Sequence, residues 1–580
     1  MASAQTDKPT IADSGPSRGS SLYLPLGLDQ TRFLLIDPAS SLDEEINCEL
    51  VAVGVEDKAI ASYEALSYTW GTEKFSCNIF IFNSLVKVTQ NLYEALRHLR
   101  DKKEKRALWV DALCINQQDV KERSSQVLLM GRIYSAVRRV VIWLGTEQDG
   151  DLQLPMLSKR IEAGSELPPE QTKMAARALF GRRWWYRSWI VQEFLMARER
   201  LFVCGSTNLE WRIIDKLCVK VMTRVVYYDL RIFAEYILAL ERTKNDPRHN
   251  TLSRLMLDFG HCQATDFRDK IYSFLSLAKD SFLINPDYTL PVECVYTDLV
   301  KRYIEEDGNL EIICQHHRGH RQISLPSWVP DWSICRGVTQ NWTSTANKVS
   351  FFAAGYLTRQ QNRYYYEEGI SFEDDQTLLL SGHSIGYINE ITPAIDPTLF
   401  DTDGWRDVIQ SWKPENVDRE QYYLTGEREF QAFCRTLVTD YYGIIRCGGS
   451  DDEFLRTVKS GIEALFSDPA REIPLNVSGN IRQAAYSSCF AILSSRHFAM
   501  VPKASEVGDD VCIFLGASTP MALRRTLSHS SEASLRDKST VKSDSITYKI
   551  IGPCYVHGVM DGEMVDQLSQ WSGEDRKSVV

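Results

Sequence analysis

The chain has 580 residues, of which 44% are hydrophobic and 25% are charged, a composition that is ordinary for globular proteins. One hydrophobic core rarely grows beyond about 250–300 residues, so we expect two to four domains. The 66 basic and 77 acidic residues give a net charge of -11, which argues against specific or non-specific nucleic-acid binding, because that function needs clustered basic residues.

The predicted organisation follows from changes in pattern along the chain. Short apolar runs alternating with amphipathic helices indicate an α/β layer domain, and a long stretch of helical spacing follows it. Short alternating runs near 480–565 predict a small antiparallel sheet or barrel. The expected regions are a disordered N-terminus at 1–20, an α/β core at 21–210, a helical extension at 211–320 and a C-terminal α+β region at 321–580, with a disordered insertion at 526–547.

The stretch 107–145 is the most informative part of the first region. Leu108–Val110 and Val140–Leu144 are apolar runs suited to buried strands, and spacings of three and four predict a helix between them. Such a βαβ unit predicts that the two strands are parallel neighbours. Asp111 and Asn116 follow the first strand, where ligands bind in open parallel sheets. These side chains would equally serve to cap the helix and bond the loop, and both interpretations stay open.

A second stretch, 177–204, places a carboxylate inside an apolar segment. Trp189 and Glu193 are four residues apart and therefore share one helical face. Burying a charge is costly unless it is paired. Glu193 is therefore either a site carboxylate that faces a cleft, or the partner of a nearby arginine, namely Arg182, Arg183 or Arg187.

Motifs of several enzyme classes are absent from the sequence. There is no P-loop, no GxSxG elbow and no HExxH pair. The cluster of Cys314, His316, His317 and His320 lacks the second ligand pair of a typical zinc site, so we expect no metal. Cys114 has no His near it in sequence and is interpreted as a buried thiol.

The cysteines and the hydropathy pattern bear on the compartment. The 14 Cys are scattered singly without a CxxC pair, as is typical of reduced thiols in a reducing compartment. No run approaches 18 apolar residues, and the N-terminal residues lack the basic and apolar regions of a secretory signal. We therefore expect a soluble cytoplasmic protein without a membrane span, and the nucleus stays open as an alternative.

Several blocks of the sequence resemble those of the fungal heterokaryon-incompatibility (HET) domain. The resemblance extends over about 25–565, and Phe267 is its one departure, at a position where Pro is common. It implies a part in fungal non-self recognition and programmed cell death, with protein partners or self-association. The blocks are YEALSYTWG (63–71), LWVDALCINQQD (108–119), RIYSAVRRVVIWLG (132–145), RRWWYRSWIVQE (182–193), ATDFRDKIYSFLSLA (264–278), PDY (286–288), LPSWVPDWS (325–333) and CYVHGVMDGE (554–563).

The HET domain in turn resembles TIR domains, which implies a flavodoxin-like core of parallel strands and helices. TIR enzymes cleave the nicotinamide–ribose bond of NAD and carry a Glu four residues after a Trp, the spacing of Trp189 and Glu193. The resemblance thus implies Glu193 as the catalytic carboxylate and NAD as a substrate, with no cofactor. Asp111, Asn116 and Trp189 would be ligand-binding residues. A non-enzymatic interaction scaffold is the alternative.

Overall fold

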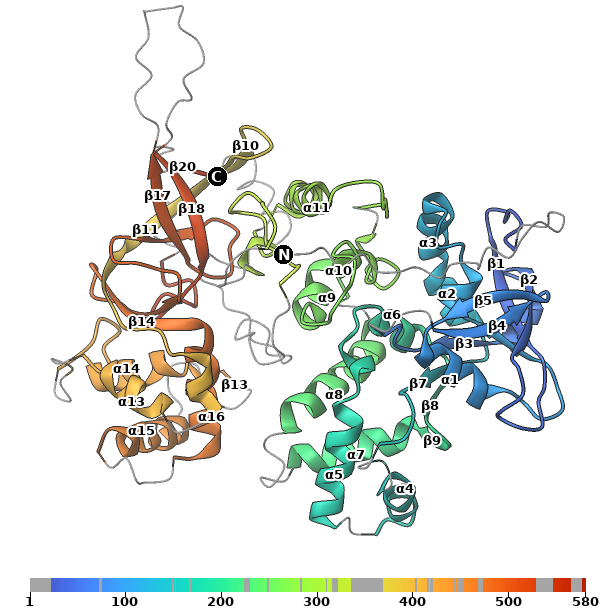
Figure 1. Cartoon of the computed structure of the whole chain (residues 1–580). Coiled ribbons are helices and arrows are strands. Elements are labelled where there is room, and N and C mark those ends of the chain that lie inside the picture. The colour runs from blue at the N-terminus through green and yellow to red at the C-terminus, as the bar shows by residue number, and fades with distance from the viewer. Residues whose placement is uncertain are drawn as a thin grey trace, which may run out of the picture. The chain divides into compact units, whose positions relative to one another are not determined.

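The computed structural model divides the chain into two compact units, Met1–Pro291 and Val292–Val580 (Figure 1). The predicted disordered segment 1–20 and most of 526–547 lie outside the residues that the structure describes. The predicted boundaries near 210 and 320 stay predictions. The described residues are 22–580 except 72–75, 149–150, 152, 166–167, 224–229, 248–249, 282–283, 309, 316–321, 335–368, 402–403, 415–416, 418–420, 443–444, 447–451, 468–472, 528–545 and 565–575.

The first unit is built on a sheet with the strand order β5-β4-β2-β1-β6-β3-β7-β8-β9. At its centre β3 pairs in parallel with β6 and β7, and β7 pairs in parallel with β8. The predicted mixed α/β fold is therefore confirmed, and the sheet contains parallel strands at its centre together with antiparallel pairs such as β1–β2 and β8–β9. The strands are β1 Gln30–Ile36, β2 Asn47–Gly54, β3 Glu64–Ser67, β4 Cys77–Ile81, β5 Ser84–Val88, β6 Arg106–Trp109, β7 Arg139–Trp143, β8 Arg200–Cys204 and β9 Thr207–Glu210.

The helices of the first unit follow or separate these strands (Figure 1). The expected face of α3 is buried through Val127, Met130 and Tyr134. Asp119 caps this helix by accepting from the amides of Lys121 and Glu122 at 2.9 and 3.1 Å. The helices are η1 Lys58–Ser62, α1 Gln90–Leu99, α2 Asp111–Cys114, α3 Val120–Ala136, α4 Leu154–Glu162, α5 Pro169–Phe180, η3 Arg183–Tyr186, α6 Trp189–Met196, α7 Trp211–Thr223, α8 Arg231–Asn245, α9 Leu252–Phe259 and α10 Asp269–Tyr272.

One sequence expectation about the sheet is wrong. The strands β6 and β7 are parallel members of one sheet, as predicted, but they are not neighbours, because β3 lies between them. Ala65 of β3 pairs with Trp109 on one side and with Val140 on the other. The strand has only four residues, all buried, and so gives no alternating signal in the sequence.

The second unit combines helices with a sheet that closes on itself. The pairings β16–β17, β17–β18, β18–β20, β20–β11 and β11–β16 form a ring, so these strands make a five-stranded barrel. The predicted β-rich unit is present. Its elements are α11 Val292–Asp307, η7 Ile313–Gln315, β10 Ile370–Phe372, β11 Leu378–Ile391, η8 Pro397–Asp401, α13 Trp405–Ser411, α14 Glu429–Leu437, β12 Tyr441–Tyr442, β13 Ile445–Arg446, α15 Asp452–Ser467, α16 Leu475–Ser487, β14 Ser488–Leu493, β15 Phe498–Pro502, β16 Asp510–Phe514, β17 Met521–Leu527, β18 Ile546–Pro553, β19 Tyr555–Val556 and β20 Arg576–Val579.

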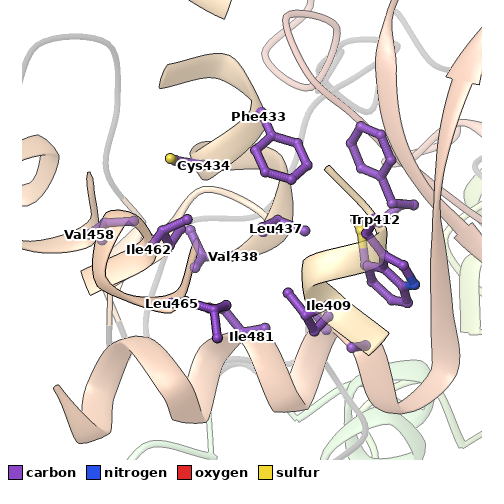
Figure 2. Close-up of a cluster of buried hydrophobic side chains, with 14 of the residues drawn as sticks. Ile409, Trp412, Phe433, Cys434, Leu437, Val438, Val458, Ile462, Leu465 and Ile481 are labelled. Carbon is purple, nitrogen blue, oxygen red and sulfur yellow. The ribbon is translucent and has the colours of Figure 1, made fainter. Parts of the chain in front are cut away.

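The helices α13, α14, α15 and α16 share one apolar core (Figure 2). Trp412 and Phe433 are almost fully buried in it, and the aliphatic side chains of α15 and α16 lie against them. Among the helices of the described ranges, none combines the length and apolar composition needed to cross a bilayer.

We predict that Gly131→Ala destabilises the first unit, although alanine usually stabilises a helix interior by about 1 kcal/mol relative to glycine. The reason is that a Cβ at Gly131 would lie 2.5 Å from Cβ of Ser276. Overpacking of this kind costs about 1–3 kcal/mol, measurable as the free energy of unfolding in urea. The double variant with Ser276→Gly should recover most of the loss, and a stable single variant would contradict the prediction.

Candidate functional site

The candidate site lies at the carboxyl ends of the central parallel strands. Among the central parallel strands, β6 follows β3 in the chain and lies on one side of it, and the next strand, β7, lies on the other side. The direction in which strands are added therefore reverses between β3 and β7, and this position is a topological switch point. Ligands in open α/β sheets bind in the crevice at such a point. Ser67 is the last residue of β3 and Tyr68 follows it, while Asp111 comes shortly after β6.

Glu193 on α6 is bound to the central strand β3 by a hydrogen bond from an uncharged side chain. Its side chain lies in the interior, with the residue only 1% exposed. The hydroxyl of Ser67 donates to its Oε2, and the hydroxyl of Tyr134 also bonds the carboxylate. The indole Nε1 of Trp184 donates to the Ser67 oxygen at 2.7 Å, which leaves the Ser67 proton for Glu193.

Of the three arginines expected near Glu193, Arg187 is the one that reaches it. Its Nη1 lies 3.9 Å from Oε2 of Glu193, which is a loose ion pair, and it donates to the carbonyl of Tyr68. Arg182 instead forms a buried ion pair with Asp151. The predicted ion pair between Glu193 and an arginine thus exists but is weak, because the uncharged hydroxyl of Ser67 lies closer to the carboxylate than Arg187 does.

Burial dominates the electrostatics of this cluster. It raises the pKa of Glu193 to about 7, and Arg187 and Ser67 offset only part of that effect. Burial also raises the pKa of Asp111, against the opposing effects of Arg187 and the Trp70 indole. Arg187 therefore lies within electrostatic reach of two carboxyl groups. Such shifts are frequent at functional sites, and structural ion pairs also produce them.

Asp111 does not itself line a pocket, but it bonds two residues, Trp70 and Ala112, that line a small one. Its Oδ2 accepts from Nε1 of Trp70 at 2.8 Å, and its Oδ1 accepts from the amide of Ala112 at 2.7 Å. The volume of the pocket that a water-sized sphere can occupy is about 10 Å³, room for about one water molecule and far less than the roughly 300–1,000 Å³ of typical ligand sites. Glu193 is not among the lining residues, which are Tyr68, Trp70, Val88, Thr89, Leu92, Ala112 and Leu113. In the observed state the carboxylate of Glu193 is closed off from this pocket.

The other two predicted site residues bond elsewhere. Oδ1 of Asn116 accepts from the amide of Gln118 at 3.2 Å, which is a local turn within the loop. The indole of Trp189 bonds the carboxylate of Asp269. The structure therefore brings Glu193 and Asp111 together around Arg187 and leaves Asn116 and Trp189 outside that cluster. Their ligand-binding roles stay predictions.

Sequence reasoning missed Ser67, Tyr68 and Trp70, and it named Arg187 only as one of three arginines that could pair with Glu193. The first three lie in the block 63–71, which carries no pattern of its own beyond the family resemblance. Within the described residues no group of three or more His, Cys, Asp or Glu side chains is placed to hold a metal, and His316, His317 and His320 lie outside them. Burial raises the pKa of the Cys114 thiol to about 12, so it stays protonated at neutral pH.

We predict that Glu193→Gln makes the protein more stable above pH 7. The folded state holds the Glu193 proton up to about pH 7, whereas the unfolded state releases it near 4.5. Folding stability therefore falls as pH rises through this window, by at most about 3 kcal/mol. The variant should lose that dependence, because glutamine carries no proton to release, and it should gain about 1–2 kcal/mol in urea unfolding above pH 7.

Glu241 offers a matched control, because it pairs with Arg200 at 2.7 Å near the surface. Glu241→Gln should not stabilise the protein at any pH. A loss of about 3–5 kcal/mol in Glu193→Gln would instead mean that the pair with Arg187 dominates, since breaking a buried ion pair has that cost.

Comparison with known proteins identifies the domain that carries this cluster. Residues 63–193 match the model of the family described as "Heterokaryon incompatibility protein (HET)". The chain is 27% identical over 455 residues to "Heterokaryon incompatibility protein 6, OR allele" of Neurospora crassa, over 61% of this chain and 64% of the relative, and so spans less than two thirds of the relative's length. No solved structure matches the chain. Residues 63–193 are thus similar to HET domains, and the chain is similar to a heterokaryon-incompatibility protein over part of its length.

Proposed function

We propose that this protein acts in fungal non-self recognition and triggers programmed cell death through its HET domain. The observation that carries the proposal is the match of residues 63–193 to the heterokaryon-incompatibility family. The similarity to a Neurospora heterokaryon-incompatibility protein beyond the HET domain supports it. The chain acts in this proposal by assembling with protein partners or with itself, in the cytoplasm or nucleus. The cysteines of the described ranges are free thiols, as suits a reducing compartment.

We predict that induced expression of the full chain in a filamentous fungus reduces viability, counted as colony-forming units. Two adjacent leucines of α3 provide a matched pair of variants. Leu129 is 7% exposed and Leu128 is 54% exposed. Leu129→Asp buries a charge and should abolish the effect together with the fold, whereas Leu128→Asp should keep both. Full viability with the wild-type chain at a confirmed protein level would refute the proposed function.

A second candidate function is a TIR-like NAD glycohydrolase, with NAD depletion as the cause of death. The order of the four central parallel strands supports it. These strands lie side by side in the order β6-β3-β7-β8. Numbered by their order along the chain, this is the order 2-1-3-4, with which a flavodoxin-like sheet begins. Glu193 and Asp111 lie at the switch point of that order.

The chemistry of this candidate requires electrostatic stabilisation above all. Nicotinamide leaves as a neutral group from a cationic ring, so the barrier falls when a carboxylate stabilises the oxocarbenium-like charge on the ribose. Glu193 would supply that charge, and Asp111, Asn116 and Trp189 would bind the substrate. Because Glu193 does not line the pocket in the observed state, the cluster must open before NAD can reach it.

We predict for this candidate that the purified full chain consumes NAD, measured by liquid chromatography, and that Glu193→Gln lowers the rate about 100- to 1,000-fold. A normal melting temperature in the variant would separate lost chemistry from lost folding. Cell death without NAD consumption by the wild-type chain would exclude the enzyme and leave the interaction scaffold as the mechanism.

A further inference from the structure

The residues that follow α9 hold the helix that carries Glu193. We call residues 263–281 and 284–290 the strap. The backbone of Gln263 forms a parallel bridge with Arg187, and its carbonyl accepts from the amide of Ser188 at 2.9 Å. The strap thus begins as a backbone extension alongside the residues just before α6.

Further contacts bind the strap to α6 itself. The carboxylate of Asp269 accepts from the indole of Trp189, the first residue of the helix. The side-chain amide of Gln192, turned to satisfy its neighbours, bonds the carbonyl of Ser273 at 3.2 Å and the hydroxyl of Ser276. Together with Gln263, these bonds fix residues on both sides of Arg187 and adjacent to Glu193.

The far end of the strap is fastened to α3 through one tyrosine. The hydroxyl of Tyr288 donates to Oδ1 of Asp269 at 2.6 Å. The guanidinium of Arg123 on α3 lies 4.0 Å from the centre of the Tyr288 ring, and that of Arg268 lies 5.3 Å from it. Tyr288 therefore contacts three groups, Asp269, Arg268 and Arg123. Because Asp269 also interacts with Trp189, Tyr288 is linked through it to α6.

We propose that the strap is a latch that keeps α6 closed over the carboxylate cluster, with Tyr288 and Asp269 as its catch. Glu193 is 1% exposed and lies outside the pocket, so a ligand or partner reaches it only after α6 moves. The strap also buries Ile271, Tyr272 and Phe274, so its opening is a local unfolding step, and such steps cost less than global unfolding. Opening the strap frees Trp189 and Gln192 first.

The test is hydrogen–deuterium exchange of the full chain, followed on peptides that cover α6. Tyr288→Phe removes the bond to Asp269 and keeps the ring under Arg123. Exchange of the α6 amides should rise roughly 3- to 10-fold, the effect of one lost hydrogen bond on a local opening equilibrium. Tyr423→Phe is the control, because it removes a hydroxyl that also makes a short hydrogen bond, accepting from the amide of Phe498 at 2.6 Å, but does so in the second unit.

The control should leave α6 exchange unchanged. Faster exchange in the strap alone, with α6 unaffected, would overturn the latch, and an equal rise in both variants would do so as well, because it would indicate general destabilisation. A second measurement rests on the proposed function: Tyr288→Phe should reduce viability at a lower expression level than the wild-type chain. Loss of this difference while α6 exchange still rises would count against the proposed function and not against the latch.

Discussion

The hydrogen bond from Ser67 to Glu193 is the contact on which the candidate site depends. It ties α6 to β3, the strand that pairs with both β6 and β7. An acid placed there is largely neutral below pH 7, so it can be buried with a hydroxyl and a distant guanidinium as its partners. Because the carboxyl group of Glu193 is largely uncharged below pH 7, the eight-residue helix α6 can pack on the sheet while carrying it.

Much of the first unit could be predicted from local pattern. The strands β6 and β7 were visible as short continuous apolar runs, and the buried face of α3 was visible from apolar residues at spacings of three and four. The position of β3 was not, since strand order in a sheet depends on contacts between residues far apart in sequence. The site shows the same division: Glu193 and Asp111 stood out as polar groups in apolar surroundings, whereas Ser67 and Arg187 gain their meaning only from the fold.

The HET family model and the compact unit have different extents. The model ends at residue 193, at the very carboxylate in question, while the first unit continues to Pro291 and includes the strap. Gly131 leaves room for Ser276, and Gln192 bonds Ser273 and Ser276, so the strap packs against the residues that match the HET family model. The sequence blocks 264–278 and 286–288, which resemble those of the HET family, thus have a structural role, because they supply Asp269 and Tyr288 of the strap.

The ring of strands in the second unit has a consequence for biosynthesis. Ser381 of β11 pairs with Arg576 of β20, 195 residues later along the chain. Until β20 has left the ribosome, β11 and β18 each present an unpaired edge, and such edges readily pair with other chains. Closing so long a loop is slow compared with local helix formation. The helices between β11 and β14 are thus complete in the chain before the strands that close the barrel have been made.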